Sequence, residues 1–207
     1  MPAPLFIAFE GGEGSGKSTQ IVRLRDSLTA AGHRVFATHE PGATSVGKAI
    51  RALLLDTDEP ITPRSEALLF AADRAHHVET ELRPRLAAGE HVLCDRYIDS
   101  SVAYQGAGRT LSTDEVARLS EWATGGLRPD LTVLLDLDPA VGLARAGSRA
   151  GHDRLEREEL DFHQRVRAGF LALAERDPAR YLVLDATRSV DELARAIHAA
   201  VAGRIAG

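Results

Sequence analysis

A glycine-rich stretch at residues 11–19 constrains this sequence more than any other feature. It reads GGEGSGKST and fits the P-loop pattern G-x-x-x-x-G-K-[ST]. An apolar run, residues 5–9, precedes it, and a segment with apolar residues three and four apart follows it. Strand, glycine-rich turn and helix in this order are the context that the pattern requires, so we expect this loop to bind the polyphosphate of a nucleotide.

The residue types in the loop suit that task. Glycines let backbone N–H groups approach a phosphate closely, and the start of the following helix adds further donors and the positive end of its dipole. We expect Lys17 to reach the β- and γ-phosphates and the Ser18 hydroxyl to coordinate Mg²⁺. The predicted ATP-binding residues in the loop are Gly11, Gly12, Glu13, Gly14, Ser15, Gly16, Lys17, Ser18 and Thr19.

Composition limits the remaining possibilities. The 207 residues, 44% of them hydrophobic, are enough for one well-packed domain over residues 1–207. The net charge of −5 and the absence of an extended basic run argue against a nucleic acid polymer or an anionic membrane as a partner. No segment has the pattern of an export signal or a membrane span, so we expect a cytoplasmic protein. The single cysteine, Cys94, lies in an apolar run and is predicted to be a buried thiol.

Strand-like and helix-like segments alternate along the chain. The predicted strands are residues 5–9, 34–38, 91–95, 131–137 and 181–185. The predicted helices follow the P-loop and cover residues 45–55, 64–88, 113–123, 139–146, 155–176 and 190–201, and residues 96–110 are predicted to be a polar loop. This order predicts an α/β protein of the P-loop NTPase type, with a five-stranded parallel sheet and helices on both faces.

In such folds ligands bind at the carboxyl ends of the strands. There the sequence places Glu40 and Pro41 after the second strand, Asp95 and Arg96 after the third, and Ala186 after the fifth. The Asp95 carboxylate suits a hydrated Mg²⁺, and the Arg96 guanidinium can grip a phosphate with two hydrogen bonds. We expect Ala186 to lie at the ATP site and the Glu40-Pro41 pair to lie on the acceptor side.

A cationic segment between two predicted helices, at about residues 145–156, resembles a mobile lid. Arg145, Arg149 and Arg154 accompany glycines in this segment. Such a lid would close over a polyphosphate, stabilise charge on the transferred phosphoryl group and exclude water. The alternative is a solvated helix face, which is how most charged runs behave.

The motifs together resemble the thymidylate kinase family. The matching strings, in order across nearly the whole chain, are FEGGEGSGKST, HEPGATSVGKAIR, EALLFAADRAHHVE, DRYIDSSVAYQG, LDLDPAVGLARA, DRLE and LDATRS. The resemblance implies transfer of the γ-phosphoryl group from Mg-ATP to thymidine monophosphate (dTMP), in a homodimer. The P-loop contains no arginine, so the chain looks like the family's bacterial type, whose basic catalytic residues come from the lid.

The resemblance also implies residue roles. Phe70 would stack on the thymine ring, Arg74 would hydrogen-bond the base edge, and Ser101 and Gln105 would complete recognition of the base. Tyr104 would crowd the 2′ position of the sugar and so favour deoxyribose.

Further implied roles concern the sugar and the phosphates. Glu13 would accept from the 3′-hydroxyl, and Arg51 and Arg96 would hold the acceptor phosphate. That phosphate is largely a dianion at neutral pH, so no catalytic base is required. The predicted catalytic residues, which align and neutralise charge, are Lys17, Arg96, Arg145, Arg149 and Arg154.

Two other functions stay open at this stage. A deoxynucleoside kinase would need a carboxylate base, for which Glu40 and Asp95 are candidates. A non-catalytic ATP-binding module would show a damaged P-loop or no lid, and neither defect is present. One departure from the family pattern, Ala43 where a second glycine usually follows the proline, leaves the geometry of that loop open if the position needs a positive φ.

The sequence also gives expectations for a histidine pair and for the single tryptophan. Adjacent residues on a helix do not face one another, so we expect His76 and His77 to lie at the surface or an interface and not to bind a metal. Trp122 is expected to be a packing residue.

Overall fold

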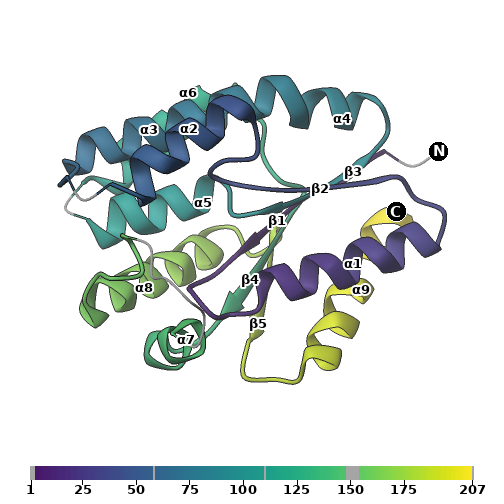
Figure 1. The fold of residues 1–207 in the computed structure, drawn as a ribbon. Helices are drawn as coiled ribbons and strands as arrows, with labels where there is room; N and C mark the ends of the chain where they lie inside the picture. Colours follow the sequence, from purple (N-terminus) through teal and green to yellow (C-terminus); the bar gives the residue numbers. More distant parts are fainter. Residues whose placement is uncertain (1–2, 58, 110, 148–153, 207) are drawn as a thin grey trace.

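The computed structural model describes residues 3–57, 59–109, 111–147 and 154–206. Its centre is a parallel five-stranded sheet with the strand order β2-β3-β1-β4-β5 (Figure 1). The strands are β1 (Phe6–Glu10), β2 (Val35–His39), β3 (His91–Asp95), β4 (Leu131–Asp136) and β5 (Tyr181–Asp185). The predicted parallel sheet is therefore confirmed, and β1, which leads into the glycine-rich loop, lies at its centre.

Helices cover both faces of the sheet (Figure 1). They are α1 (Lys17–Ala30), α2 (Ser45–Leu55), α3 (Pro63–His77), α4 (Arg83–Ala87), α5 (Ile98–Ser101), α6 (Thr113–Thr124), α7 (Pro139–Ala146), α8 (Leu160–Arg176) and α9 (Val190–Ala206). Two π-helical segments, η1 (Val78–Leu82) and η2 (Val102–Gly108), continue α3 and α5. In Figure 1, α1 and α9 lie on one side of the sheet, and α2 to α6 with α8 lie on the other.

Alternation along β1 divides the core between these two layers. Ile7 and Phe9 belong to the hydrophobic cluster that contains residues of α1 and α9. Phe6 and Ala8 point the other way and pack in a cluster with residues of η1 and β3. Because successive side chains of a strand face opposite sides of the sheet, a central strand covered by helices on both faces must be apolar at every position.

The prediction of a polar loop at residues 96–110 is wrong. Most of this segment is helical, as α5 followed by η2, and much of it is buried. Its glycines serve close packing, because a Cβ atom added at Gly108 would lie 2.7 Å from the Phe162 ring. A composition rich in glycine and serine therefore did not indicate a solvent-exposed turn here.

Of two helix boundaries, one agrees with the prediction and one differs. The helix predicted over residues 64–88 is observed as α3, η1 and α4, which run without a break from Pro63 to Ala87, and Pro84 falls in the first turn of α4, where a missing N–H is tolerated. The helix predicted from residue 155 begins at Leu160 instead. Leu155 itself is buried in the cluster under α8.

Two side chains lie where they were not expected. His77 is fully buried, whereas the sequence predicted a surface or interface position. Trp122, predicted to be a packing residue, is 81% exposed. Cys94 is a buried thiol on β3, as predicted.

Within the residues that the structure describes, every helix falls short of the length or apolar character that a bilayer crossing requires.

Candidate active site

The glycine-rich loop closes on itself where β1 ends and α1 begins. Gly16 has φ 93° at the N-cap of α1, a conformation that side-chain-bearing residues rarely adopt. The Lys17 ammonium donates to the carbonyl oxygens of Gly11 and Gly12, both at 3.0 Å, and the Ser15 hydroxyl donates to Gly12 at 2.8 Å. The lysine is therefore held over the loop that a phosphate would enter.

The environment of Lys17 lowers the pKa of its ammonium group. Burial is the main cause, and the neighbouring Arg96 guanidinium adds to it, so the pKa of Lys17 falls to about 8. Nearby carboxylates, among them Asp95 and Glu13, oppose this shift. The ammonium is thus close to deprotonation just above physiological pH.

ATP binding is expected to weaken as the pH rises above about 8. Phosphate prefers the ammonium form of Lys17, so once the amine is neutral the Kd for ATP should rise by at most about tenfold per pH unit. Calorimetric titration without acceptor, from pH 7 to pH 9.5, measures this, with Lys17→Arg as a control that keeps its charge throughout. A slope shared by the wild type and Lys17→Arg would contradict this assignment.

Ser18 and Asp95, the two predicted magnesium ligands, lie side by side. The Ser18 hydroxyl donates to Asp95 Oδ2 at 2.9 Å, which joins the start of α1 to the end of β3. Both side chains offer oxygen atoms, the donors that Mg²⁺ prefers. The donor chemistry of this pair therefore fits a magnesium ion.

Arg96, Glu13 and Tyr104 form a compact charged group beside the loop. Arg96 donates to Glu13 at 2.8 Å, and the Tyr104 hydroxyl donates to the same carboxylate at 2.7 Å. The guanidinium also lies 4.9 Å from the centre of the Tyr104 ring. Burial acts to raise the pKa of Glu13, but the charges of Arg96 and Lys17 outweigh it, so the pKa lies below its ordinary value and the group is a carboxylate acceptor.

Glu10, which the sequence analysis missed, supports the turn that carries Arg96. Arg96 has a left-handed backbone at φ 68°. The Glu10 carboxylate accepts from the backbone N–H groups of Tyr97 at 2.8 Å and Ser100 at 3.2 Å, and from the Ser100 hydroxyl at 2.6 Å. Burial, with a contribution from Asp99, raises the pKa of Glu10 to about 7. A carboxylic residue at the end of an otherwise apolar strand was the available signal.

Arg74 is buried and held by three hydrogen bonds. It donates through Nε to Glu40 at 2.7 Å, through Nη1 to Ser101 at 2.9 Å, and through Nη2 to the Tyr97 carbonyl at 3.0 Å. Arg74 thus joins helix α3 to helix α5 and the residue before it, a segment that was predicted to be a loop. A rigid guanidinium at the wall of a cleft is suited to recognise a flat polar ring edge.

Glu66, another residue that the sequence analysis missed, joins Gln105 to the predicted lid. It is fully buried and accepts from Gln105 at 3.0 Å and from Arg109 at 3.2 Å. Arg154 also donates to Glu66, and to the Leu54 carbonyl at 2.9 Å. Although burial acts to raise the pKa of Glu66, hydrogen bonds from Arg109 and Arg154 lower it below the ordinary value.

Two of the predicted lid arginines have different hydrogen-bond partners. Arg154 donates to Glu66, and Arg145 donates at 3.2 Å to the carbonyl of Ala186, the residue predicted to lie at the ATP site. Arg149 lies outside the described residues.

In the loop after β2, position 43 does not need the positive φ that would require a glycine. The positive φ, 106°, belongs to Gly42, and Ala43 is not among the residues with a positive φ. Arg51 donates to the Pro41 carbonyl at 2.9 Å, and a Cβ atom at Gly42 would lie 2.8 Å from the Arg51 side chain. Only the first residue after Pro41 therefore needs to be glycine.

These side chains line one open cleft of about 590 Å³ at the carboxyl ends of the strands. Its lining includes Glu13, Gly14, Lys17, Ser18, Glu40, Pro41, Arg51, Phe70, Arg74, Asp95, Arg96, Ser101, Tyr104 and Gln105. A cleft of this size admits a drug-sized or nucleotide-sized ligand. The fold and the cleft together define a P-loop kinase of the nucleoside monophosphate type.

Comparison with known proteins identifies the family. Residues 9–197 match the family model described as thymidylate kinase. The thymidylate kinase of Deinococcus radiodurans is 56% identical over 204 residues, which cover 99% of both chains. That of Leifsonia xyli subsp. xyli is also 56% identical and covers 97% of this chain and 96% of its own.

A solved structure agrees with these relatives. The crystal structure of thymidylate kinase from Ehrlichia chaffeensis aligns with a TM-score of 0.78 at 29% identity, over 97% of this chain and 99% of that one. This chain belongs to the thymidylate kinase family and is an ATP-dependent phosphotransferase. The comparisons favour neither a deoxynucleoside kinase nor a non-catalytic ATP-binding module.

Proposed function

We propose that this enzyme transfers the γ-phosphoryl group of Mg-ATP to dTMP and forms the diphosphate for dTTP synthesis. The observation that carries this proposal is that one cleft is lined both by P-loop residues and by residues suited to hold a base. The second set includes Phe70, Arg74 and Gln105. An aromatic platform with fixed polar groups rejects a wrong base more strongly than an apolar pocket does, because mismatched polar groups stay unpaired.

The charged group beside the P-loop is assigned to the sugar and the acceptor phosphate. The Glu13 carboxylate accepts from the 3′-hydroxyl, and the Tyr104 ring crowds the 2′ position. Arg96 and Arg51 hold the acceptor phosphate, and the Arg96–Glu13 ion pair at 2.8 Å supports this assignment because it fixes the guanidinium before substrate binds. Ser101 completes the base site through its hydrogen bond with Arg74.

Magnesium is assigned to Ser18 and Asp95. When bound, the ion neutralises charge on the β- and γ-phosphates. Lys17 and the backbone N–H groups of the P-loop orient the same phosphates, and Arg96 aligns the acceptor. Phosphoryl transfer then depends on position and electrostatics, without a protein base.

The geometry disfavours Glu40 as the base of a deoxynucleoside kinase. Glu40 is buried, and its two carboxylate oxygens accept from Arg74 and His77. The other candidate, Asp95, accepts from Ser18. Both carboxylates therefore already accept hydrogen bonds from protein side chains.

The test is ATP consumption with a panel of nucleoside and deoxynucleoside monophosphates and free thymidine, with Lys17→Ala as the blank. We expect turnover with dTMP far above that with the other acceptors. Turnover chiefly with cytidine or adenosine monophosphate would overturn the base-site assignment, and phosphorylation of free thymidine would make the enzyme a nucleoside kinase.

Arg149→Ala is expected to lower kcat far more than it weakens dTMP binding. The reason is that a lid arginine stabilises charge on the transferred phosphoryl group, which develops only in the transition state. Steady-state kinetics and dTMP titration measure the two effects. The matched control is Arg188→Ala, whose side chain lies outside the predicted lid. Equal losses in turnover and binding, or no loss in either, would contradict the role.

The lid itself is part of the proposal. We assign residues 145–156 to a mobile segment within a single domain, residues 1–207. The hydrogen bond from Arg145 to the Ala186 carbonyl supports a position for the start of this segment on the ATP side of the cleft.

We further propose a homodimer located in the cytoplasm. Helices α2, α3 and α6 lie in one layer (Figure 1). Each of them exposes a large apolar side chain, namely Leu53, Leu68 and Trp122. Burial of such a surface against a second copy would stabilise a two-fold dimer. Sedimentation analysis should give a dimer for the wild type and a monomer for Leu53→Glu/Leu68→Glu, with Val190→Glu on α9 as the control.

A further inference from the structure

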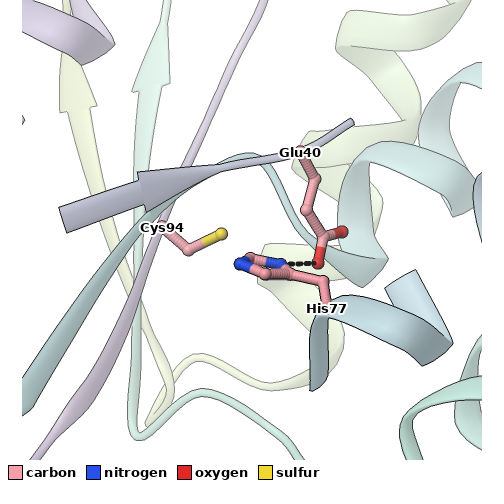
Figure 2. Close-up of side chains that lie close together, drawn as sticks. All are labelled: Glu40, His77 and Cys94. Carbon is pink, nitrogen blue, oxygen red and sulfur yellow. Dashed lines mark hydrogen bonds and ion pairs between the residues drawn. The ribbon is translucent and has the colours of Figure 1, made fainter. Parts of the chain in front are cut away.

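Three buried side chains meet behind the base-recognition side of the cleft. Glu40 follows β2, His77 ends α3 and Cys94 lies on β3, and each is buried (Figure 2). Their potential ligand atoms all lie within 4.8 Å of one another. Carboxylate, imidazole and thiol at this spacing could hold a transition metal, so the cluster needs a chemical explanation.

The chemistry of the cluster argues against a metal. Glu40 is already paired with the Arg74 guanidinium at 2.7 Å, and a second cation there would be repelled. Burial raises the pKa of Cys94 well above its ordinary value, so the sulfur keeps its proton and donates to the Arg96 carbonyl at 3.1 Å. Thiols bind metals as thiolates, whereas the Cys94 thiol stays protonated and uses its hydrogen in a hydrogen bond.

Two of these residues, His77 and Glu40, form a continuous chain of hydrogen bonds that runs from Thr38 to Arg74. His77 Nε2 lies 2.9 Å from the Thr38 hydroxyl, and His77 Nδ1 lies 2.9 Å from Glu40 Oε1. A carboxylate paired with arginine only accepts, so Nδ1 carries the hydrogen that points to Glu40 and Nε2 can accept from Thr38. Figure 2 shows the imidazole turned with one nitrogen toward the carboxylate.

Each oxygen of the Glu40 carboxylate therefore accepts a hydrogen bond that helps to fix the side chain. His77 occupies Oε1, and Arg74 Nε donates to Oε2 at 2.7 Å. The guanidinium is then oriented about Nε, and its Nη1 and Nη2 atoms are set against Ser101 and the Tyr97 carbonyl. Without the His77 contact, Oε1 would be a buried acceptor without its donor, and Arg74 alone would hold the carboxylate.

We propose that His77 is a positioning residue for base recognition, acting through Glu40 on Arg74. This inference rests on the proposed role of Arg74 as the reader of the base edge. A guanidinium only donates, so a correctly oriented Arg74 favours a pyrimidine with a 4-oxo group over one with a 4-amino group. His77 would thus contribute to the preference for dTMP over dCMP without touching either nucleotide.

Two substitutions separate this role from simple packing. The amide nitrogen of His77→Asn can take the place of Nδ1 and keep the donor to Glu40, whereas that of His77→Gln can take the place of Nε2 and keep only the contact with Thr38. We expect His77→Gln to raise the KM for dTMP about tenfold, with kcat and the KM for ATP changed by less than about threefold. His77→Asn should stay within about threefold of the wild type in all three constants.

The base preference gives a readout that a structural role would not move. The ratio of kcat/KM for dTMP to that for dCMP should fall about tenfold in His77→Gln and stay near wild type in His77→Asn. Two control variants, Thr38→Val and Cys94→Ser, alter neighbours of His77 that do not hydrogen-bond Glu40. Both should keep the wild-type ratio of kcat/KM for dTMP to that for dCMP. Melting temperatures, measured on each variant, identify any that is simply unfolded.

Four outcomes decide the matter. The expected split between Asn and Gln supports the proposal. Equal behaviour of the two variants in folded protein overturns it and leaves a packing role. Metal in the purified wild type, lost in Cys94→Ser as well as in His77→Gln, overturns it in favour of a metal site. If the wild type prefers another monophosphate, the proposed substrate fails, and the same comparison with that nucleotide still decides the role of His77.

Discussion

Replacement of Arg96 by alanine is expected to lower kcat about 1,000-fold, the loss expected when a cation is removed from the path of phosphoryl transfer. The structure explains the size of this effect. Arg96 follows β3 and contacts the P-loop, since it donates to Glu13 at 2.8 Å and to the Gly11 carbonyl at 3.2 Å. Its side chain is 20% exposed, so its charge acts with little screening by water.

Single-turnover and steady-state kinetics with dTMP measure this loss. Arg96→Lys keeps the charge but not the forked geometry, and we expect it to recover only a small part of the rate. Arg23→Ala, which removes a surface arginine paired with Asp191, is the control and should leave kcat unchanged. A kcat for Arg96→Ala within about threefold of the wild type would show that Arg96 does not act in the transfer.

Gly11→Ala is expected to destabilise the protein by about 3 kcal/mol or more, from backbone strain and a steric clash together. Gly11 has φ 135°, and a Cβ atom there would lie 2.4 Å from the Leu135 carbonyl oxygen on β4. Because β4 is hydrogen-bonded to β1, neither strand can retreat without loss of pairing. A fall in Tm of about 6–12 °C follows for a domain of this size.

The neighbouring glycine provides a matched control. A Cβ atom at Gly12 would meet nothing within 4 Å, and Gly12 is not among the residues with a positive φ. Thermal denaturation without nucleotide should therefore give Gly12→Ala a stability within about 0.5 kcal/mol of the wild type. Equal melting temperatures for the two alanine variants would contradict the claim that the contact with Leu135 requires glycine at position 11.

Local patterns predicted much of the fold. The P-loop, the apolar strands and the helix over Ser45–Leu55 were recognisable because each depends on residues close in sequence. The cap of α6 by Ser112 is equally local, since a capping side chain bonds within its own turn. Ser18 and Asp95 were assigned to one magnesium site, and the structure places them side by side because parallel strands bring their carboxyl ends to one edge.

The errors occurred where a distant element decides a residue's environment. His77 was expected at the surface or an interface because it follows another histidine on a helix. It is buried instead, because Thr38 on β2 and Glu40 in the loop after β2 pack against it and hydrogen-bond its ring. The partner of Arg154, a residue assigned to the lid, was not predicted either, because it is a buried acid on α3, Glu66. Burial of Glu66 could not be inferred from a sequence position that reads as an ordinary charged residue in the first turn of a helix.

The sequence by itself thus determined the nucleotide-binding loop, the order of strands and helices, and the family, since all three follow from motifs and short-range periodicity. Only the tertiary structure decided that residues 98–108 form a buried helix and that Arg74 is oriented through Glu40 and His77. It also decided that Glu10 supports the left-handed turn at Arg96. The physical reason is that a buried polar side chain is defined by its partners, and these partners come from strands and helices far apart in the chain.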